Sequence, residues 1–181
     1  EIAPAPVLRP ETRAKLLHAA TTLAAAADYL NAGTFEFLVD TATDAVAFIE
    51  ANVRLQVEHT VTEEVTGIDL VRAQLDIAAG AKLSDLGLTQ ADIPKPRGVA
   101  IQVRVNLETM QPDGSVRGAG GVLGAYEPPS GPGVRVDGYG YAGYRTNPRF
   151  DSLLAKVIVH GRSDRFEDAT VKTVRALSEF R

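Results

Sequence analysis

The sequence predicts an α+β protein in two parts, with mixed helices and strands first and mainly antiparallel β-structure after them. Three patterns predict this class: an amphipathic helix near the N-terminus, a β-hairpin that follows it, and a long alternation of apolar and polar residues in the second half. The chain has 181 residues, of which 45% are hydrophobic and 23% are charged, so it is large enough for two small domains with ordinary cores.

The first helix is expected to start at Pro10, because proline suits the first helical turn. Residues 1–9 contain spaced prolines and are expected to be extended. Apolar residues then recur at steps of four and three on one helix face: Leu16, Ala20, Leu23, Ala27 and Leu30. The helix is expected to end near Asn31 and Gly33.

A β-hairpin is predicted next, with strands at Thr34–Val39 and Ala45–Asn52 joined by a turn centred on Thr43. This register places Glu36 directly opposite Glu50. Side chains on a strand alternate in direction, so the two carboxylates would lie on one face of the hairpin.

Two carboxylates directly opposite each other repel and destabilise a sheet. A hard divalent cation such as Mg²⁺ removes the repulsion, because it takes oxygen ligands and often joins carboxylates to substrate phosphates. Glu36, Glu50 and Asn52, which is two residues further along the same face, are therefore candidate ligands of a Mg²⁺–nucleotide site. The alternative is a pair of solvated glutamates on an open sheet face, and the hairpin alone does not separate the two.

Polar residues continue on alternate positions after the hairpin, and Asn52, Arg54, Gln56 and Glu58 would project to one side of an extended backbone. The planar guanidinium of Arg54 suits a small oxyanion such as bicarbonate. Glu58 beside it could act as a general base. The alternative is a surface ion pair between Arg54 and Glu58, which the four polar residues beside the carboxylates disfavour.

Two helices are expected after these polar residues. Thr60–Glu63 resembles a capping box, and Asp69 is expected to cap a helix that runs to Ala79 and stops at Gly80. Residues 83–97 form a proline-containing linker, at which the chain is expected to divide.

The second part is predicted to be a small antiparallel β-unit with one terminal helix. Residues 99–107 alternate between apolar and polar, residues 152–160 form another apolar strand, and residues 113–144 are rich in glycine and proline. The apolar face of the final helix is expected to hold four residues: Phe166, Thr170, Val174 and Leu177. Three tyrosines are interpreted as packing at strand ends: Tyr139, Tyr141 and Tyr144.

Charge and cysteine content disfavour several classes of function. The formal net charge is -4 and no basic run occurs, so nucleic acid and anionic membranes are poor candidates as partners. No apolar run is long enough to cross a bilayer. The absence of cysteine excludes disulfides, thiolate metal sites and a cysteine nucleophile, and it agrees with a cytoplasmic protein.

Together these motifs resemble the biotin carboxylase signature of the acyl-CoA and pyruvate carboxylase family. The matching segments are 33–38, 48–59, 66–71, 100–106, 133–135, 141–144 and 151–156. The Arg-x-Gln-Val-Glu-His run at 54–59 is the most specific, because other ATP-grasp ligases share only the Glu…Glu-x-Asn pattern. The resemblance implies the C-terminal half of an ATP-grasp domain at 1–82, the linker at 83–97, and an incomplete biotin carboxylase C-terminal domain, β-rich with a terminal helix, at 98–181.

The resemblance implies a nucleotide and metal site at the hairpin. Glu36 and Glu50 would bind the Mg²⁺ (or Mn²⁺) of ATP, with Asn52 beside them. Leu38 would line the adenine pocket.

The resemblance also implies sites for bicarbonate and biotin. Arg54, Gln56 and the Val57 backbone would hold bicarbonate, and Glu58 would deprotonate it for attack on the γ-phosphate of ATP, which gives carboxyphosphate. Arg104 would stabilise the enolate of biotin, an oxyanion-type role.

Partners implied by the resemblance are a biotin carboxyl carrier domain, a carboxyltransferase unit that selects the acyl acceptor, and a second copy in a homodimer or larger assembly. Arg135 falls in the stretch that forms the dimer interface of bacterial relatives, although Pro132 replaces an aromatic residue often found there. The stretches 107–110 and 127–135 look more like the large multidomain acyl-CoA carboxylases than the single-domain bacterial subunit. Two alternatives are a non-catalytic dimerisation or assembly module of a carboxylase and a different ATP-grasp ligase.

The N-terminal nucleotide-fold domain and the lid of the family have no counterpart in this sequence, which contains no GxxxxGK[ST] loop. We therefore expect this chain alone to have no carboxylase activity. Incubation with ATP, bicarbonate and free biotin is expected to yield no ADP above background, and clear turnover would refute this expectation.

Overall fold

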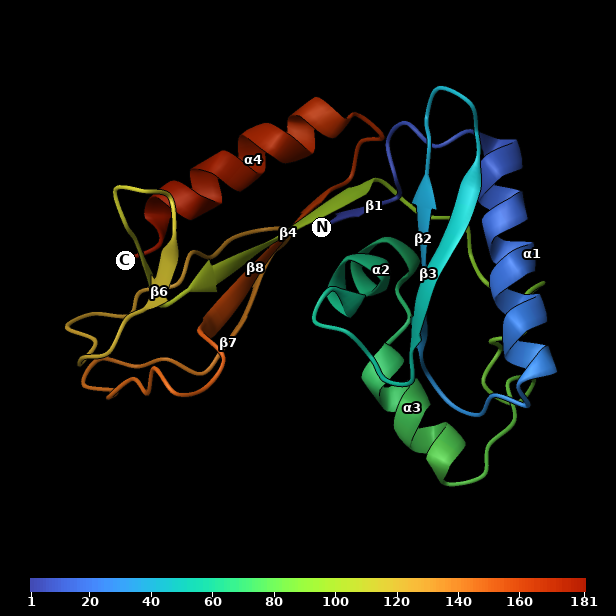
Figure 1. The fold of residues 1–181 in the computed structure, drawn as a ribbon, viewed down its shortest axis with the longest axis horizontal. Coiled ribbons are helices and arrows are strands. Elements are labelled where there is room, and N and C mark those ends of the chain that lie inside the picture. Colours follow the sequence, from blue (N-terminus) through green and yellow to red (C-terminus); the bar gives the residue numbers. More distant parts are fainter. The chain divides into compact units, whose positions relative to one another are not determined.

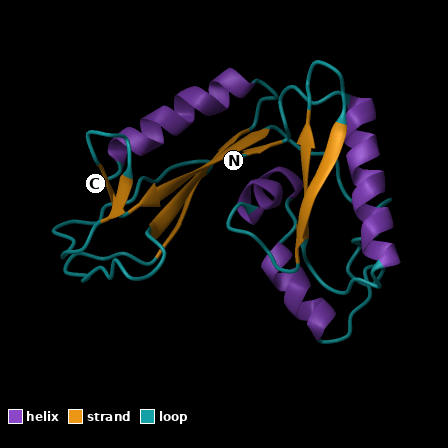
Figure 2. Cartoon of the chain, viewed as in Figure 1, coloured by secondary structure: helices purple, strands orange, loops and turns teal.

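Two compact units make up the chain in the computed structural model, which describes residues 1–181 (Figure 1). One unit consists of Pro4–Pro96, and the other consists of Glu1–Ala3 together with Arg97–Arg181. Both units contain helices and strands (Figure 2), as expected for an α+β protein. None of the helices combines the length and the hydropathy that a bilayer crossing requires.

The first helix, α1 (Pro10–Ala26), begins at the proline as predicted but ends about one turn early. Asp28 and Asn31 have φ values of 46° and 75°, and residues in this left-handed region do not continue a right-handed helix. Leu30 therefore lies outside the helix and is 84% exposed. The apolar face predicted to extend to Leu30 was wrong in its last turn.

The predicted hairpin is present in the same unit. Its strands β2 (Thr34–Val39) and β3 (Val46–Asn52) pair antiparallel. Glu36 lies opposite Glu50, so the register predicted for the two carboxylates is confirmed.

Helices α2 (His59–Thr66) and α3 (Leu70–Ala78) follow the hairpin. Asp69 caps α3 as predicted, by accepting a backbone N–H of its first turn at 2.8 Å. The capping box predicted at Thr60–Glu63 was wrong, because α2 already begins at His59 and has no side-chain cap. The Glu63 carboxylate instead accepts the first backbone N–H of α3, at 3.0 Å.

The other unit contains a four-stranded antiparallel sheet, which confirms the predicted β-unit. Its strands, in spatial order, are β1 (Ile2–Ala3), β4 (Val99–Asn106), β8 (Leu153–Gly161) and β7 (Val134–Gly138). Strand β1 comes from the N-terminal residues that the sequence predicted only as extended chain. Strands β5 (Glu108–Met110) and β6 (Val116–Gly118) form a separate hairpin. Helix α4 (Phe166–Glu179) lies across one face of the sheet (Figure 1).

Helix α4 packs on the sheet mainly through small residues, and not through the whole face that was predicted. Its buried residues are Ala169, Thr173 and Ala176. Phe166 and Leu177 of the predicted face do contact the core, but Val174 is 63% exposed. Small side chains let the helix backbone approach Val157 and Val159 of β8 closely, and this spacing decides which face is buried.

Gly98 joins the linker to β4 at a φ of 67°, and a Cβ here would overlap the Gly161 carbonyl oxygen. We expect Gly98→Ala to lower the free energy of unfolding by more than about 3 kcal/mol, because the strain of a positive φ, about 1–2 kcal/mol, adds to a clash with backbone. Gly114→Ala is the matched control: φ is 82° but no atom lies within 4 Å of its Cβ, so only the strain applies. Equal losses for the two variants in urea titrations would contradict the steric argument.

Candidate functional site

A pair of facing carboxylates lies on the hairpin of β2 and β3. Glu36 and Glu50 are direct cross-strand partners. The side-chain amide of Asn52 donates to Oε1 of Glu36 at 2.8 Å and to Oε1 of Glu50 at 2.9 Å. The amide of Gln56 donates to the same Glu36 oxygen at 2.6 Å. Two amides therefore offset part of the repulsion between the carboxylates.

A β-bulge keeps the Phe48 ring off the carboxylate face of the hairpin. Beyond the glutamate pair the register shifts, so that Phe37 pairs with Phe48 and Ile49 is an extra residue in β3. In a regular strand without the bulge, Phe48 would share the face of Glu50, because side chains two positions apart point the same way. The bulge instead pairs the two phenyl rings edge to face, with centroids 5.6 Å apart.

The donor set fits a small, hard cation. All three side-chain hydrogen bonds to the two glutamates end on Oε1, which leaves both Oε2 atoms available as ligands. No group of three or more His, Cys, Asp or Glu side chains that could hold a metal occurs in residues 1–181. A cation here would therefore rely on two carboxylates, the Asn52 amide oxygen and water, a shell that Mg²⁺ accepts.

The polar residues after the hairpin do not lie on one extended strand, so that prediction was wrong. The backbone bends at residues 53–54 and turns at 57–58, where Glu58 has helical φ and ψ values of −78° and −1°. Gln56 nevertheless reaches Glu36, because the bend folds the chain back toward the hairpin. Arg54 is exposed, and its Nη1 donates to the Leu55 carbonyl at 3.3 Å.

A largely buried pair of side chains on α2 supports the turn. His59 Nδ1 lies 3.0 Å from Glu63 Oε1, and the two side chains are only 15% and 9% exposed. The same Glu63 oxygen accepts the Leu70 N–H, so one carboxylate connects the start of α2 to the start of α3. The sequence analysis missed this pair, although its i,i+4 spacing on a helix is a readable signal.

Two other predicted residues are not part of this hydrogen-bonded cluster. Leu38 shares the face of Glu36 on β2 and is 65% exposed. Arg104 belongs to the other unit, on β4, where its Nε donates to Oε1 of Glu1 at 3.0 Å. The structure thus brings together Glu36, Glu50, Asn52 and Gln56 from the predicted set.

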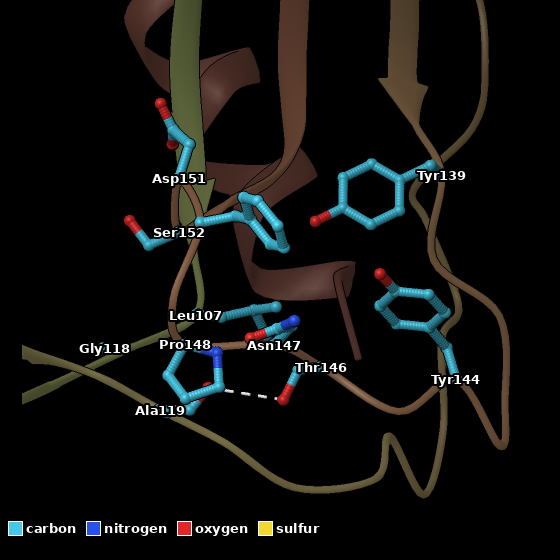
Figure 3. Close-up of a pocket in the computed structure, with 11 residues that line it drawn as sticks. Leu107, Gly118, Ala119, Tyr139, Tyr144, Thr146, Asn147, Pro148, Asp151 and Ser152 are labelled. Carbon is cyan, nitrogen blue, oxygen red and sulfur yellow. Dashed lines mark hydrogen bonds between the residues drawn. The ribbon is translucent and has the colours of Figure 1, made fainter.

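A small pocket of about 60 Å³ lies in the sheet-containing unit (Figure 3). Tyr139 and Tyr144 direct their hydroxyls toward it, and their rings pack edge to face with centroids 5.4 Å apart. Burial raises the pKa of Tyr139, and Tyr144 and Asp151 add to this effect. Tyr141 packs on Tyr144 in the same way, which agrees with the interpretation of the three tyrosines as packing residues. The pocket has room for about two water molecules.

The segment Gly138–Gly143 also has the spacing GxGxxG, which the sequence analysis did not identify. Such loops bind dinucleotides when a helix follows, because the helix N-terminus faces the pyrophosphate. Here β7 ends at Gly138 and the next regular element is β8, so the motif lacks that context.

An ion-pair network crosses strands β7 and β8. Arg135 donates to both carboxylate oxygens of Asp137, at 2.8 and 2.9 Å, and Lys156 Nζ lies 3.5 Å from Asp137. Burial acts to raise the pKa of Asp137, but the hydrogen bonds and charges of Arg135 and Lys156 outweigh it and the pKa is lowered. The role of Arg135 at a dimer interface stays a prediction.

Two protein-family models match the chain. The model described as "Carbamoyl-phosphate synthase L chain, ATP binding domain" matches residues 1–86. The model described as "Biotin carboxylase C-terminal domain" matches residues 102–181.

The chain is also similar in sequence to parts of longer carboxylases. It is 49% identical over 186 residues to a pyruvate carboxylase of Pichia angusta, a match that covers 100% of the chain and 15% of that protein. It is 42% identical to biotin carboxylase 1 of Bacillus subtilis (strain 168), over 99% of the chain and 38% of that protein. The chain thus spans well under half the length of these relatives.

Solved structures resemble the chain over nearly its whole length. A single-chain, multi-domain long-chain acyl-CoA carboxylase matches with a TM-score of 0.94 and 46% identity, over 99% of the chain and 19% of that protein. The biotin carboxylase domain of a single-chain bacterial carboxylase matches with a TM-score of 0.89 and 47% identity, over 99% of the chain and 40% of that one.

Replacing one of the two facing charges tests the electrostatics of the hairpin. In buffer without divalent cations, Glu50→Gln is expected to raise the free energy of unfolding by about 0.5 kcal/mol, because it removes a cross-strand repulsion. Added Mg²⁺ is expected to stabilise the original chain more than the variant, which lacks one ligand. Glu127→Gln, at an exposed glutamate in the other unit, is the control for both urea titrations. A variant that is less stable without Mg²⁺ would contradict the repulsion.

Proposed function

Because this chain belongs to the biotin carboxylase family, we propose that it supplies part of a site that carboxylates biotin with MgATP and bicarbonate. The observation that carries the proposal is the cluster of Glu36, Glu50, Asn52 and Gln56, in which two facing carboxylates are held by two amides. Such an arrangement is costly in a sheet without a cation and useful with one.

The hairpin is proposed to hold the metal ion of ATP. Glu36 and Glu50 would provide carboxylate oxygens, and Asn52 would provide an amide oxygen. Bound there, Mg²⁺ or Mn²⁺ would supply positive charge that offsets the charge on the phosphates. The Gln56 amide orients the Glu36 carboxylate, and Leu38 on the same face of β2 offers apolar surface to the adenine ring.

The turn after the hairpin is proposed to bind and activate bicarbonate. Arg54 is exposed and carries a planar fork of donors that matches a bicarbonate ion, with Gln56 and the Val57 N–H as further donors. Glu58, the next residue on the turn, is proposed as the base that takes the bicarbonate proton before attack on the γ-phosphate. The His59–Glu63 pair supports this turn from the α2 side.

Arg104 is proposed to stabilise the oxyanion that forms on the ureido group of biotin. It lies on β4, in the unit that contains the four-stranded sheet. In domain terms, we assign residues 1–82 to the C-terminal part of an ATP-grasp domain, 83–97 to a linker, and 98–181 to a biotin carboxylase C-terminal domain.

Further partners are proposed from the family. Multidomain relatives suggest a biotin carboxyl carrier domain, which presents biotin, and a carboxyltransferase unit, which selects the acyl acceptor. A homodimer formed through the strand that carries Arg135, and a relation to multidomain acyl-CoA carboxylases in particular, are proposed on the same basis. The cytoplasmic location stays a prediction, since one relative is named as a mitochondrial pyruvate carboxylase.

Substitutions in the whole protein that carries this chain separate a catalytic role from an assembly role. Arg54→Ala is expected to lower bicarbonate-dependent ATP cleavage by about 100-fold or more, because it removes an anion-binding group from the site of charge development. Glu50→Gln is expected to raise the KM for MgATP and lower kcat. Oligomeric state, measured by size exclusion with light scattering, is expected not to change.

Arg72→Ala is the matched control, because Arg72 is an exposed arginine whose ion pair with Asp76 lies on α3. This variant is expected to behave like the original protein. Changed assembly in Arg54→Ala or Glu50→Gln, with activity retained per assembled particle, would favour the assembly module and refute the catalytic proposal.

A further inference from the structure

We propose that Glu1 is a positioning residue for Arg104. This proposal rests on the proposed function of Arg104 in biotin carboxylation. Glu1 belongs to neither the carboxylate hairpin nor the turn that follows it. Its carboxylate contacts Arg104 directly, across two strands that are about a hundred residues apart in sequence.

The backbone of the sheet sets this contact. Strands β1 and β4 are antiparallel, with Ile2 opposite Ile101. One residue further, the Glu1 backbone nitrogen donates to the Gln102 carbonyl and the Gln102 N–H donates to the Glu1 carbonyl, both at 2.9 Å. Glu1 and Gln102 therefore lie opposite each other with their side chains on one face. Arg104, two residues along β4, is a diagonal neighbour on that face.

The Glu1 carboxylate accepts hydrogen bonds from two side chains, those of Gln102 and Arg104. Its Oε2 accepts from the Gln102 amide at 3.2 Å, and its Oε1 accepts from Arg104 Nε at 3.0 Å. Gln102 is only 1% exposed, so its amide is a fixed donor that sets the direction of the carboxylate. Arg104, by contrast, keeps 43% of its side chain exposed, and a ligand can reach it.

This arrangement suits an arginine that must meet an oxyanion in one orientation. A free arginine side chain populates many rotamers, and a catalytic donor is effective only when it is already in place. Glu1 engages Nε, the nitrogen next to the aliphatic stem of Arg104, so this contact sets the direction in which the guanidinium points. An ion pair as exposed as this one contributes little to folding stability, which allows a positioning role to be separated from a structural one.

The test uses the whole protein that carries this chain, with free biotin as substrate. Glu1→Gln is expected to lower kcat for biotin carboxylation at least about tenfold with a smaller change in the KM for biotin, because misplacing a reacting group by about 1 Å can cost about 100-fold. Bicarbonate-dependent ATP cleavage without biotin and the midpoint of thermal unfolding are expected to be unchanged. Glu1→Asp keeps the charge and is expected to restore part of kcat.

Glu179→Gln is the matched control, because it breaks a similar pair, Arg175 Nε to Glu179 Oε1 at 3.5 Å, on α4 of the same unit. It is expected to leave both activities unchanged. An unchanged kcat in Glu1→Gln, or an equal loss of biotin carboxylation and biotin-independent ATP cleavage, overturns the positioning role alone. An unmodified protein without any biotin-dependent ATP cleavage overturns the proposed function, and this inference with it.

Discussion

The repulsion between Glu36 and Glu50 is the constraint on which the candidate site depends. Two carboxylates directly across a sheet raise its free energy, and the chain offsets this with amide donors. Asn52 can donate because it lies on the same face of β3, but Gln56 can do so only if the chain turns back after the strand. The bend at residues 53–54 is therefore coupled to the carboxylate pair, and it sets where Arg54 and the following turn begin.

Short-range interactions stabilise the hairpin and the turn that follows it. On the hairpin, one extra residue in β3 moves an aromatic ring from the carboxylate face to the opposite face, where it packs on Phe37. On the turn, the carboxylate of Glu63 connects His59 to the start of α3. The bulge and the Glu63 contacts both join residues close in sequence. The geometry of the polar cluster therefore needs few contacts from distant parts of the chain.

In the sheet-containing unit, the polar groups are positioned by pairing between strands that are far apart in sequence. Strand β1 joins β4 from the other end of the chain, and this pairing places Glu1 beside Gln102 and Arg104. Helix α4 covers the same sheet through alanines and a threonine, which permit a close approach. Arg104 therefore has a partner that comes from far away in sequence, whereas the glutamates of the hairpin have partners within twenty residues.

Sequence alone was sufficient for the α+β class, the hairpin with Glu36 opposite Glu50, the cap at Asp69 and the β-unit with its final helix, because periodicity, turns and caps are local signals. It was also sufficient for the family, through residues 54–59. Tertiary structure decided the early end of α1, the bulge at Ile49 and the turn at Glu58, since each depends on which alternative conformation packs and pairs best. It alone placed Glu1 beside Arg104, because a pairing between strands so distant in sequence leaves no local pattern.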